Sequence, residues 1–218
     1  MVGFGQVVLV SSATSQEGKS ATTASLAAAA CAAGRRVLVV DCDLRAPTLH
    51  TAFNLDLTPG VAECVEGAVE YDSALQYHPD TGVWLLSAGN TYEAPQRLLH
   101  SAAMARLLSQ LRDSFDLVLL DTPPVLAVSD VRTLAPVADH TMLIVAWSRT
   151  EWAASKLALR MLREAGAQIV GAVLSRVDVA QLARFELPEA QIYGKPYSKY
   201  RRVYRTRPSP RCYAEAEA

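Results

Sequence analysis

The sequence predicts an α/β domain in which helices cover both faces of a mostly parallel β-sheet. Short runs of consecutive apolar residues alternate with longer amphipathic segments along most of the chain. Continuous apolar runs are typical of strands buried on both faces, and their alternation with helices favours parallel pairing through crossover connections. Half of the 218 residues are hydrophobic, so the chain can bury a sizeable core.

The expected strands are recognised by their composition. The first, QVVLVS, is a short apolar run, and each later strand is a similar run bounded by polar residues, Gly or Pro. Runs of four to eight such residues are typical of strands in a buried sheet. The six strands predicted are residues 6–11, 37–41, 83–87, 117–121, 141–146 and 169–174.

The expected helices separate these strands. The first is rich in alanine, the best helix former, and Gly34 follows it as a stop signal. The long helical segment before the fourth strand is expected to break near His100. The helices predicted are residues 20–33, 61–67, 71–76, 95–114, 128–138 and 151–165.

The apolar periodicity fades after Asp178. We therefore expect a folded domain over residues 1–178, a connecting segment over 179–192 and a flexible tail over 193–218, disordered in isolation. The tail carries seven Lys or Arg and two Glu, a net charge of +5, so the rest of this −1 chain carries −6. No signal peptide or membrane span is predicted, and the four cysteines lack CxxC spacing, which favours reduced thiols in a cytoplasmic protein.

A phosphate-binding loop is predicted between the first strand and the first helix. It consists of Ala13, Thr14, Ser15, Gln16, Glu17, Gly18, Lys19 and Ser20, with Ala21 following in the helix. A GxxxxGK[ST] pattern between a strand and a helix is the P-loop of nucleotide-binding proteins, here with Ala13 at the first Gly. Backbone N–H groups and the helix dipole hold phosphates in such loops, the lysine reaches the β- and γ-phosphates of ATP, and the serine ligates Mg²⁺. The fold expected is therefore of the P-loop NTPase type.

Three aspartates stand at the ends of two predicted strands. Asp41 and Asp43 end the second strand and Asp121 ends the fourth, so they are expected near the P-loop, where ligands bind open parallel sheets. We expect Ser20, Asp41 and Asp121 to hold Mg²⁺, Asp121 through a water molecule. Asp41 and Asp43 are two residues apart at one strand end, and either one is the candidate general base. Arg45 is a candidate for stabilising phosphate charge or for a subunit contact.

Three segments carry a family resemblance: SATSQEGKS, VLVVDCDLRAPTLH and LVLLDTPPVLAVSD. Together they resemble the bacterial tyrosine kinases, P-loop enzymes of polysaccharide synthesis and export that are unrelated in fold to eukaryotic-type kinases. The resemblance covers about residues 7–178 and the tail. It implies that Lys19 and Ser20 form Walker A, Asp41 and Asp43 form Walker A′, and Asp121 forms Walker B.

The tail is rich in tyrosine. It holds five of the eight tyrosines in the chain: Tyr193, Tyr197, Tyr200, Tyr204 and Tyr213. Such a cluster is the autophosphorylation substrate in the family, so the resemblance implies an ATP- and Mg²⁺-dependent autokinase acting between subunits and regulating polysaccharide synthesis or export. It also implies a ring-like homo-oligomer and a membrane polysaccharide co-polymerase or activator, fused or separate, at the inner face of the cell membrane. A basic aromatic tail also suits nucleic acid or anionic lipid; beside the kinase motifs we prefer the substrate interpretation and expect no nucleic-acid partner.

Two other functions are compatible with the motifs. A positioning ATPase of the ParA/MinD group shares the fold, but these proteins usually carry a second lysine early in the loop, where this chain has Thr14. A nucleotide-gated interaction module of polysaccharide assembly is the second alternative. The chain departs from its relatives at Ser15, where the kinases commonly have Pro, and at Ser175, where related ATPases often have Asn. No HRD or DFG triplet of eukaryotic-type kinases is present, and the four histidines are scattered, which disfavours a histidine-based metal site.

Overall fold

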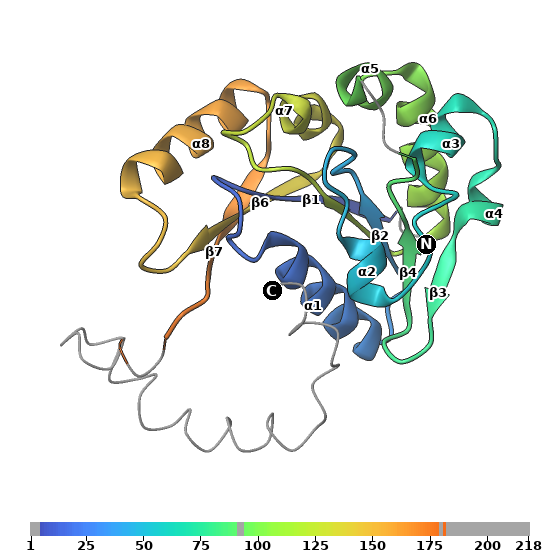
Figure 1. Cartoon of the computed structure of the whole chain (residues 1–218), viewed down its shortest axis with the longest axis horizontal. Helices are drawn as coiled ribbons and strands as arrows, with labels where there is room; N and C mark the ends of the chain where they lie inside the picture. The colour runs from blue at the N-terminus through green and yellow to red at the C-terminus, as the bar shows by residue number, and fades with distance from the viewer. Residues whose placement is uncertain (1–4, 91–93, 179–180, 182–218) are drawn as a thin grey trace.

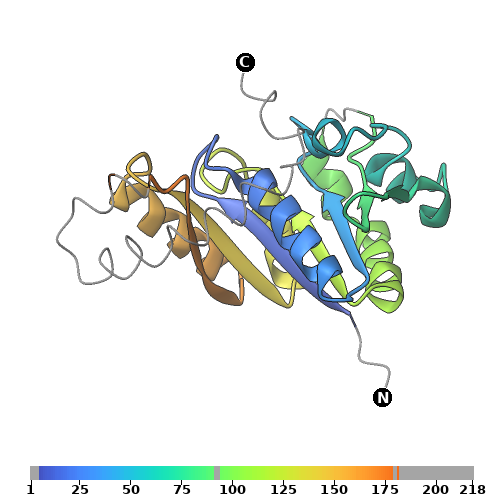
Figure 2. The same cartoon turned by 90° about the horizontal axis from the view of Figure 1, so that it is seen from below.

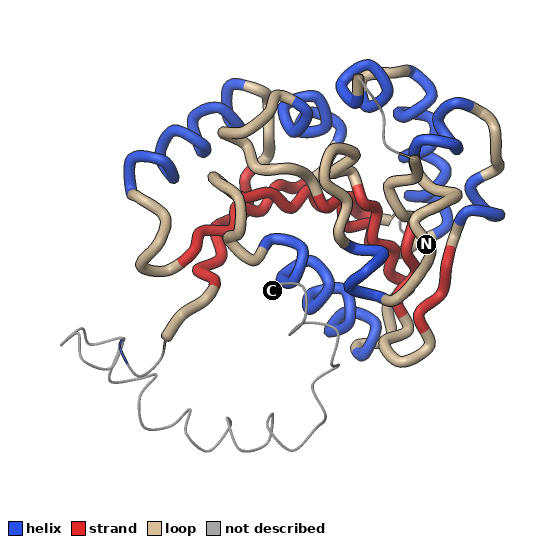
Figure 3. Tube along the Cα trace, viewed as in Figure 1, coloured by secondary structure: helices blue, strands red, loops and turns tan. Residues whose placement is uncertain are grey.

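The structure is a computed structural model that describes residues 5–90, 94–178 and 181. Its strands are β1 (Gln6–Ser12), β2 (Val37–Asp41), β3 (Gln76–His78), β4 (Val83–Leu86), β5 (Leu117–Asp121), β6 (His140–Ala146) and β7 (Ile169–Ser175). They form one seven-stranded sheet in the order β3-β4-β2-β5-β1-β6-β7 (Figures 1 and 3). Every pair is parallel except β3 with β4, which is antiparallel. The expected mostly parallel sheet is therefore confirmed.

Helices cover both faces of this sheet. They are α1 (Lys19–Ala32), α2 (Leu49–Phe53), α3 (Val61–Glu66), α4 (Tyr71–Ala74), α5 (Pro95–Leu99), α6 (Ala102–Ser114), α7 (Asp130–Leu134) and α8 (Trp152–Glu164). Helices α1 and α2 lie on one face and share a core with alternate residues of β2, β4 and β5. Helices α3, α5, α6, α7 and α8 lie on the other face, over a larger core (Figure 2).

The register of the sheet positions the functional edge. In the pairing of β2 with β5, Asp41 lies opposite Asp121, so both strands end at the same level. Val10 of β1 is also opposite Asp121, and β1 continues from there into the P-loop. The three central strands therefore deliver the loop and two carboxylates to one edge of the sheet.

The six predicted strands are all present, and the predicted helix break near His100 is confirmed. Helix α5 ends at Leu99, and α6 starts after Ser101, whose hydroxyl accepts a hydrogen bond from the backbone N–H of Met104 at 3.1 Å. A serine at this position caps the free N–H groups of the new helix and so favours a restart over continuation.

Three details of the prediction are wrong. The helix expected over residues 71–76 ends at Ala74, and Gln76 starts the edge strand β3. The side-chain amide of Gln76 accepts the backbone N–H of Asp56 and donates to the backbone carbonyl of the same residue, which holds Gln76 in the strand. Helix α2 was not predicted. The helix expected over residues 128–138 is limited to α7 and a following 3₁₀ turn, Ala135–Val137, since Pro136 cannot supply the N–H that an α-helix needs.

Within the part of the chain that the structure describes, no helix is both long and apolar enough to cross a bilayer. Strand β7 ends at Ser175, close to the predicted end of the folded domain. Apart from Gln181, the predicted connecting segment and tail lie outside the described residues.

Candidate functional site: a P-loop facing paired carboxylates

The P-loop lies between β1 and α1, as the sequence predicts. Gln16 and Gly18 adopt positive φ angles of 60° and 78°, which bend the loop back to the N-terminus of α1. A side chain at position 18 would meet no close atom, so the left-handed backbone conformation is the reason for glycine there. The 14-residue helix α1 starts at Lys19 and directs its free N–H groups and positive dipole end at the loop.

Glu17 braces this loop from inside. Its side chain is only 2% exposed, and one carboxylate oxygen accepts the backbone N–H of Thr14 at 2.7 Å while the other accepts the hydroxyl of Thr150. The backbone carbonyl of Glu17 accepts the hydroxyl of Ser175, at the end of β7. The Glu17 side chain is thus turned into the fold, and the loop is tied to the end of β7 and to the segment after β6 by contacts that sequence reasoning missed.

Lys19 and Ser20 meet on the carboxylate of Asp121. The Nζ atom of Lys19 lies 2.8 Å from Oδ2 of Asp121, and the Ser20 hydroxyl donates to the same oxygen at 2.7 Å. The hydroxyl of Thr23 donates to Oδ1 at 3.1 Å. The structure therefore brings together two of the predicted metal ligands and the predicted lysine. Thr23 was missed, although its position four residues after Lys19 puts both on one face of α1.

Asp41 is completely buried next to this cluster. Its Oδ1 accepts the backbone N–H of Asp43 at 3.1 Å, and its Oδ2 accepts the backbone N–H of Leu49 at 3.2 Å. Burial, and then the negative charge of Asp121, raises the pKa of Asp41 from its ordinary 3.8 to about 7, against the opposing charge of Lys19. Burial and the charge of Asp121 therefore favour the protonated form of Asp41 more than that of an ordinary aspartate.

Asp43 lies beyond the end of β2, in a turn. Its Oδ1 accepts the backbone N–H of Ala46 at 3.2 Å, and its side chain is half-buried. The extended backbone of β2 stops at Asp41, so Asp43 is no longer part of the sheet. Burial raises the pKa of Asp43, and Lys19 opposes this shift. Of the two carboxyl groups, that of Asp43 is the more accessible.

Arg45 is paired with a carboxylate that sequence reasoning did not single out. Its Nε lies 2.8 Å and its Nη2 3.3 Å from the two oxygens of Asp130, the first residue of α7. The Asp130 side chain is 1% exposed and that of Arg45 38%. Asp130 is the last residue of the LVLLDTPPVLAVSD segment, and its place in that motif is the one sequence feature that could have pointed to it. The pair ties the loop after β2 to α7.

The residues present fit a magnesium ion. No group of three or more His, Cys, Asp or Glu side chains converges on one point within the described residues. Magnesium needs only one or two carboxylates, since it keeps water and phosphate oxygens as its other ligands. Ser20 and Asp121 supply a hydroxyl and a carboxylate in contact at the P-loop, with Asp41 behind them. The predicted phosphoacceptors, Tyr193, Tyr197, Tyr200, Tyr204 and Tyr213, lie outside the described residues.

The chain is similar in sequence and fold to known proteins. Residues 8–191 match the family described as the CobQ/CobB/MinD/ParA nucleotide binding domain. The tyrosine-protein kinase YwqD of Bacillus subtilis is 34% identical over 168 residues, which are 77% of this chain and 71% of that protein. The succinoglycan biosynthesis transport protein ExoP of Rhizobium meliloti is 30% identical over 202 residues, which are 89% of this chain and 25% of that protein. The solved kinase domain of the Escherichia coli tyrosine kinase ETK superposes with a TM-score of 0.76 at 29% identity, covering 78% of this chain and 67% of that one.

These matches all include the nucleotide-binding domain. The match to YwqD covers most of both proteins, and the chain spans only a quarter of ExoP, so the shared part is the nucleotide-binding domain. The chain therefore belongs to the CobQ/CobB/MinD/ParA nucleotide-binding family and, within it, to the bacterial tyrosine kinases, so that its enzyme class is the protein-tyrosine kinase that the motifs predict.

Proposed function

We propose that this chain is an ATP- and Mg²⁺-dependent autokinase that phosphorylates the tyrosines of the C-terminal tail of a neighbouring subunit. The observation that carries the proposal is the contact of Lys19 and Ser20 with the single carboxylate of Asp121, at the edge where the P-loop lies. A lysine, a hydroxyl and a carboxylate in contact at the start of a P-loop helix are the groups that phosphoryl transfer requires.

Each residue has a distinct part in this mechanism. The loop backbone, the N-terminus of α1 and Lys19 bind the phosphates of ATP. Ser20 and Asp121 would hold Mg²⁺, with Asp41 beside them. When bound, the ion neutralises charge on the β- and γ-phosphates. Asp41 serves best as a supporting carboxyl, because it is fully buried and both of its oxygens accept backbone N–H groups.

Asp43 is our choice for the general base. A tyrosine hydroxyl has a pKa near 10, so its attack on phosphorus benefits from a positioned proton acceptor. Asp43 is the more accessible carboxyl at this edge, and its raised pKa makes it a better acceptor than an ordinary aspartate. The tyrosine hydroxyl gives its proton to Asp43, its oxygen bonds to the γ-phosphorus, and ADP leaves with the electrons of the broken bond.

The surroundings of the kinase are part of the proposal. ExoP, a transport protein of succinoglycan synthesis, is about four times as long as the segment shared with this chain. We infer a role in polysaccharide synthesis or export, with a membrane co-polymerase or activator that is either fused to this domain or a separate chain. The domain would then act at the inner face of the cell membrane as a ring-like homo-oligomer.

The test is mass spectrometry of protein expressed with a phosphatase and then incubated with ATP and Mg²⁺. We expect phosphate on tail tyrosines of the parent protein and none on Lys19→Met, which lacks the phosphate-binding ammonium. Mixing a mass-labelled Lys19→Met chain with the parent separates the two routes, because phosphate on the inactive chain requires transfer between subunits. Nucleotide binding without phosphotyrosine, even with a candidate activator segment present, would overturn the kinase proposal in favour of a nucleotide-gated interaction module.

A further inference from the structure

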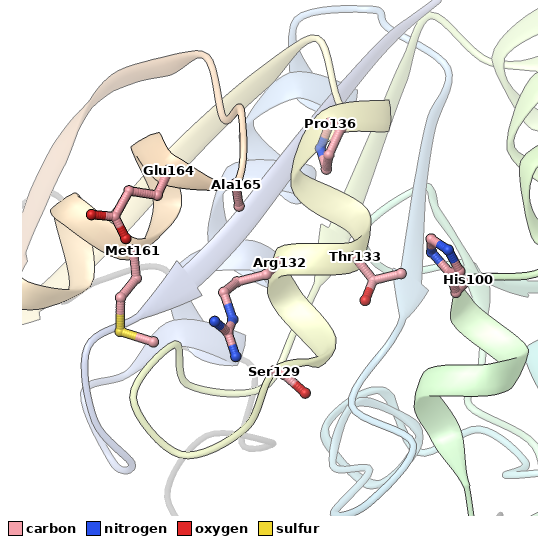
Figure 4. Close-up of a pocket in the computed structure, with 8 residues that line it drawn as sticks. All are labelled: His100, Ser129, Arg132, Thr133, Pro136, Met161, Glu164 and Ala165. Carbon is pink, nitrogen blue, oxygen red and sulfur yellow. The ribbon is translucent and has the colours of Figure 1, made fainter.

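A groove lies on the outer side of the domain, between α5, α7 and α8. One part, of about 430 Å³, is lined by residues of α7 and α8, by the turn after α7 and by His100, which follows α5 (Figure 4). A second part, of about 450 Å³, extends along α5 and shares His100, Ser129 and Thr133 with the first. No residue of the P-loop and neither Asp41 nor Asp121 contributes to either lining. The groove is therefore separate from the phosphate-transfer site.

Two arginines give the groove positive charge. Arg97 lies on its α5 side and Arg132 on α7, with His100 nearby, while Glu164 is the one carboxylate among the lining residues. Neither arginine forms an ion pair within the described ranges, whereas Arg35, Arg45 and Arg112 all do. In Figure 4, Arg132 extends from α7 on the side of Met161, and Thr133 extends on the other side towards His100. Two guanidinium groups that have no carboxylate partner among the described residues favour an anionic ligand.

The remaining lining suits an aromatic group beside that anion. Pro136, Met161 and Ala165 supply apolar surface, and Ser129 and Thr133 supply hydroxyl groups. The thioether of a methionine packs well against aromatic rings. The walls are also joined, because the side-chain amide of Gln96 donates to the hydroxyl of Ser129 at 2.9 Å and so links α5 to the start of α7. The groove thus combines cationic, hydroxyl and apolar surface on connected elements.

We propose that this groove binds phosphotyrosine, with the phosphorylated tail of this chain or of a neighbouring copy as its ligand. The inference rests on the proposed function for the supply of phosphotyrosine. Arg97 and Arg132 bind the phosphate, for which planar guanidinium groups are well matched, and the ring packs against Met161 and Pro136. The unmodified tail has a net charge of +5 and is repelled by the two arginines. Each phosphate adds about −1.5 to −2, so a singly phosphorylated tail still carries roughly +3, and its attraction to the groove comes from the phosphate itself rather than from the net charge of the tail. The groove therefore selects the product of the kinase over its substrate.

The test is the binding of synthetic peptides to phosphatase-treated full-length protein, measured by fluorescence anisotropy. The peptides span residues 193–204 and carry phosphate at Tyr197, at Tyr200 or at neither. We expect a phosphopeptide to bind at least about tenfold more tightly than the unmodified peptide, and Arg97→Gln and Arg132→Gln each to weaken it by about tenfold. Arg106→Gln is the matched control, because this exposed arginine of α6 lies outside the groove lining and loses the same charge; it should change affinity less than about twofold.

Two further arms identify the ligand. A scrambled phosphotyrosine peptide that binds as tightly as the tail peptide shows that the groove takes phosphotyrosine in any sequence, and weaker binding identifies the tail as its source. Equal binding of phosphopeptide by the parent and by an Arg97→Gln/Arg132→Gln double variant overturns the proposal, and so does an equal loss in the Arg106 control. If the double variant binds phosphopeptide as the parent does but no longer binds anionic vesicles, the groove is instead assigned to a lipid surface. Because the phosphate is synthetic, the result is independent of kinase activity.

Discussion

The pairing of Arg45 with Asp130 makes a prediction that separates a structural from a directly catalytic arginine. In Arg45→Met the apolar stem remains, but the carboxylate of Asp130, 1% exposed, loses the partner of both its oxygens. Removing one member of a buried ion pair costs about 3–5 kcal/mol. Arg45 is itself more than one-third exposed, so water reaches the pair and we discount the cost to about 1–3 kcal/mol.

The assay is a double-mutant cycle of Arg45→Met and Asp130→Asn, with unfolding by urea as the measure of stability. Asp130→Asn should cost less than Arg45→Met, because the guanidinium that it leaves behind can turn to solvent. The double variant should be more stable than the sum of the single losses predicts, with a coupling of about 1–2 kcal/mol. The matched control is Arg35→Met, whose pair with Asp116 is exposed on both sides at 3.9 Å and should be worth less than about 0.5 kcal/mol.

Autophosphorylation of the same variants completes the test. If Arg45 acts by fixing the loop that carries Asp43, Arg45→Met and Asp130→Asn lower the rate by similar factors. A rate lost in Arg45→Met but retained in Asp130→Asn, together with additive stabilities, would refute the reasoning and assign Arg45 directly to the phosphates.

Three further predictions concern other parts of the domain. Thr150→Val removes a hydroxyl that donates to Glu17, so nucleotide affinity measured by calorimetry should fall about three- to tenfold, and Thr150→Ser should retain the parent affinity. An unchanged affinity in Thr150→Val would show that this contact does not support nucleotide binding. Without Mg²⁺, Asp41 should stabilise the fold below about pH 4 and lose this contribution as pH rises through 7, because its pKa is raised in the folded state. Urea unfolding from pH 4 to 8 should therefore show a flatter profile for Asp41→Asn, and parallel profiles would contradict the shift. Leu111→Ala, on the buried face of α6, should lower the free energy of unfolding by about 2–5 kcal/mol, and a loss below about 1 kcal/mol would contradict this packing.

Most of the sheet could be predicted because its strands are buried on both faces. Such burial leaves an uninterrupted aliphatic run in the sequence, as in residues 117–121, and six of the seven strands have one. The seventh, β3, reads QYH and is held at the edge by the contacts of Gln76 with Asp56, which lie twenty residues apart. Helix α2 spans five residues, too few for a periodic pattern.

The residues of the candidate site were also only partly predictable from the sequence. Lys19, Ser20 and Asp121 could be placed from the sequence, because a loop motif and a strand end each fix a position relative to the sheet edge. Their supports could not, because Asp130 is 85 residues from Arg45 and Thr150 is 133 residues from Glu17. Such contacts depend on how helices pack over the sheet, which no local pattern of residues encodes.

Helix α7 begins where two connections meet. Ser129 accepts a hydrogen bond from α5 in the wall of the groove, and the next residue, Asp130, holds Arg45 in the loop of the catalytic carboxylates. Ser129 and Asp130 are adjacent in the chain, so a shift of one residue moves the other. If a ligand in the groove changes the affinity for nucleotide through this helix, linkage requires nucleotide to change the affinity of the groove by the same factor. Such a domain would sense its own phosphorylation and its own nucleotide state as one equilibrium.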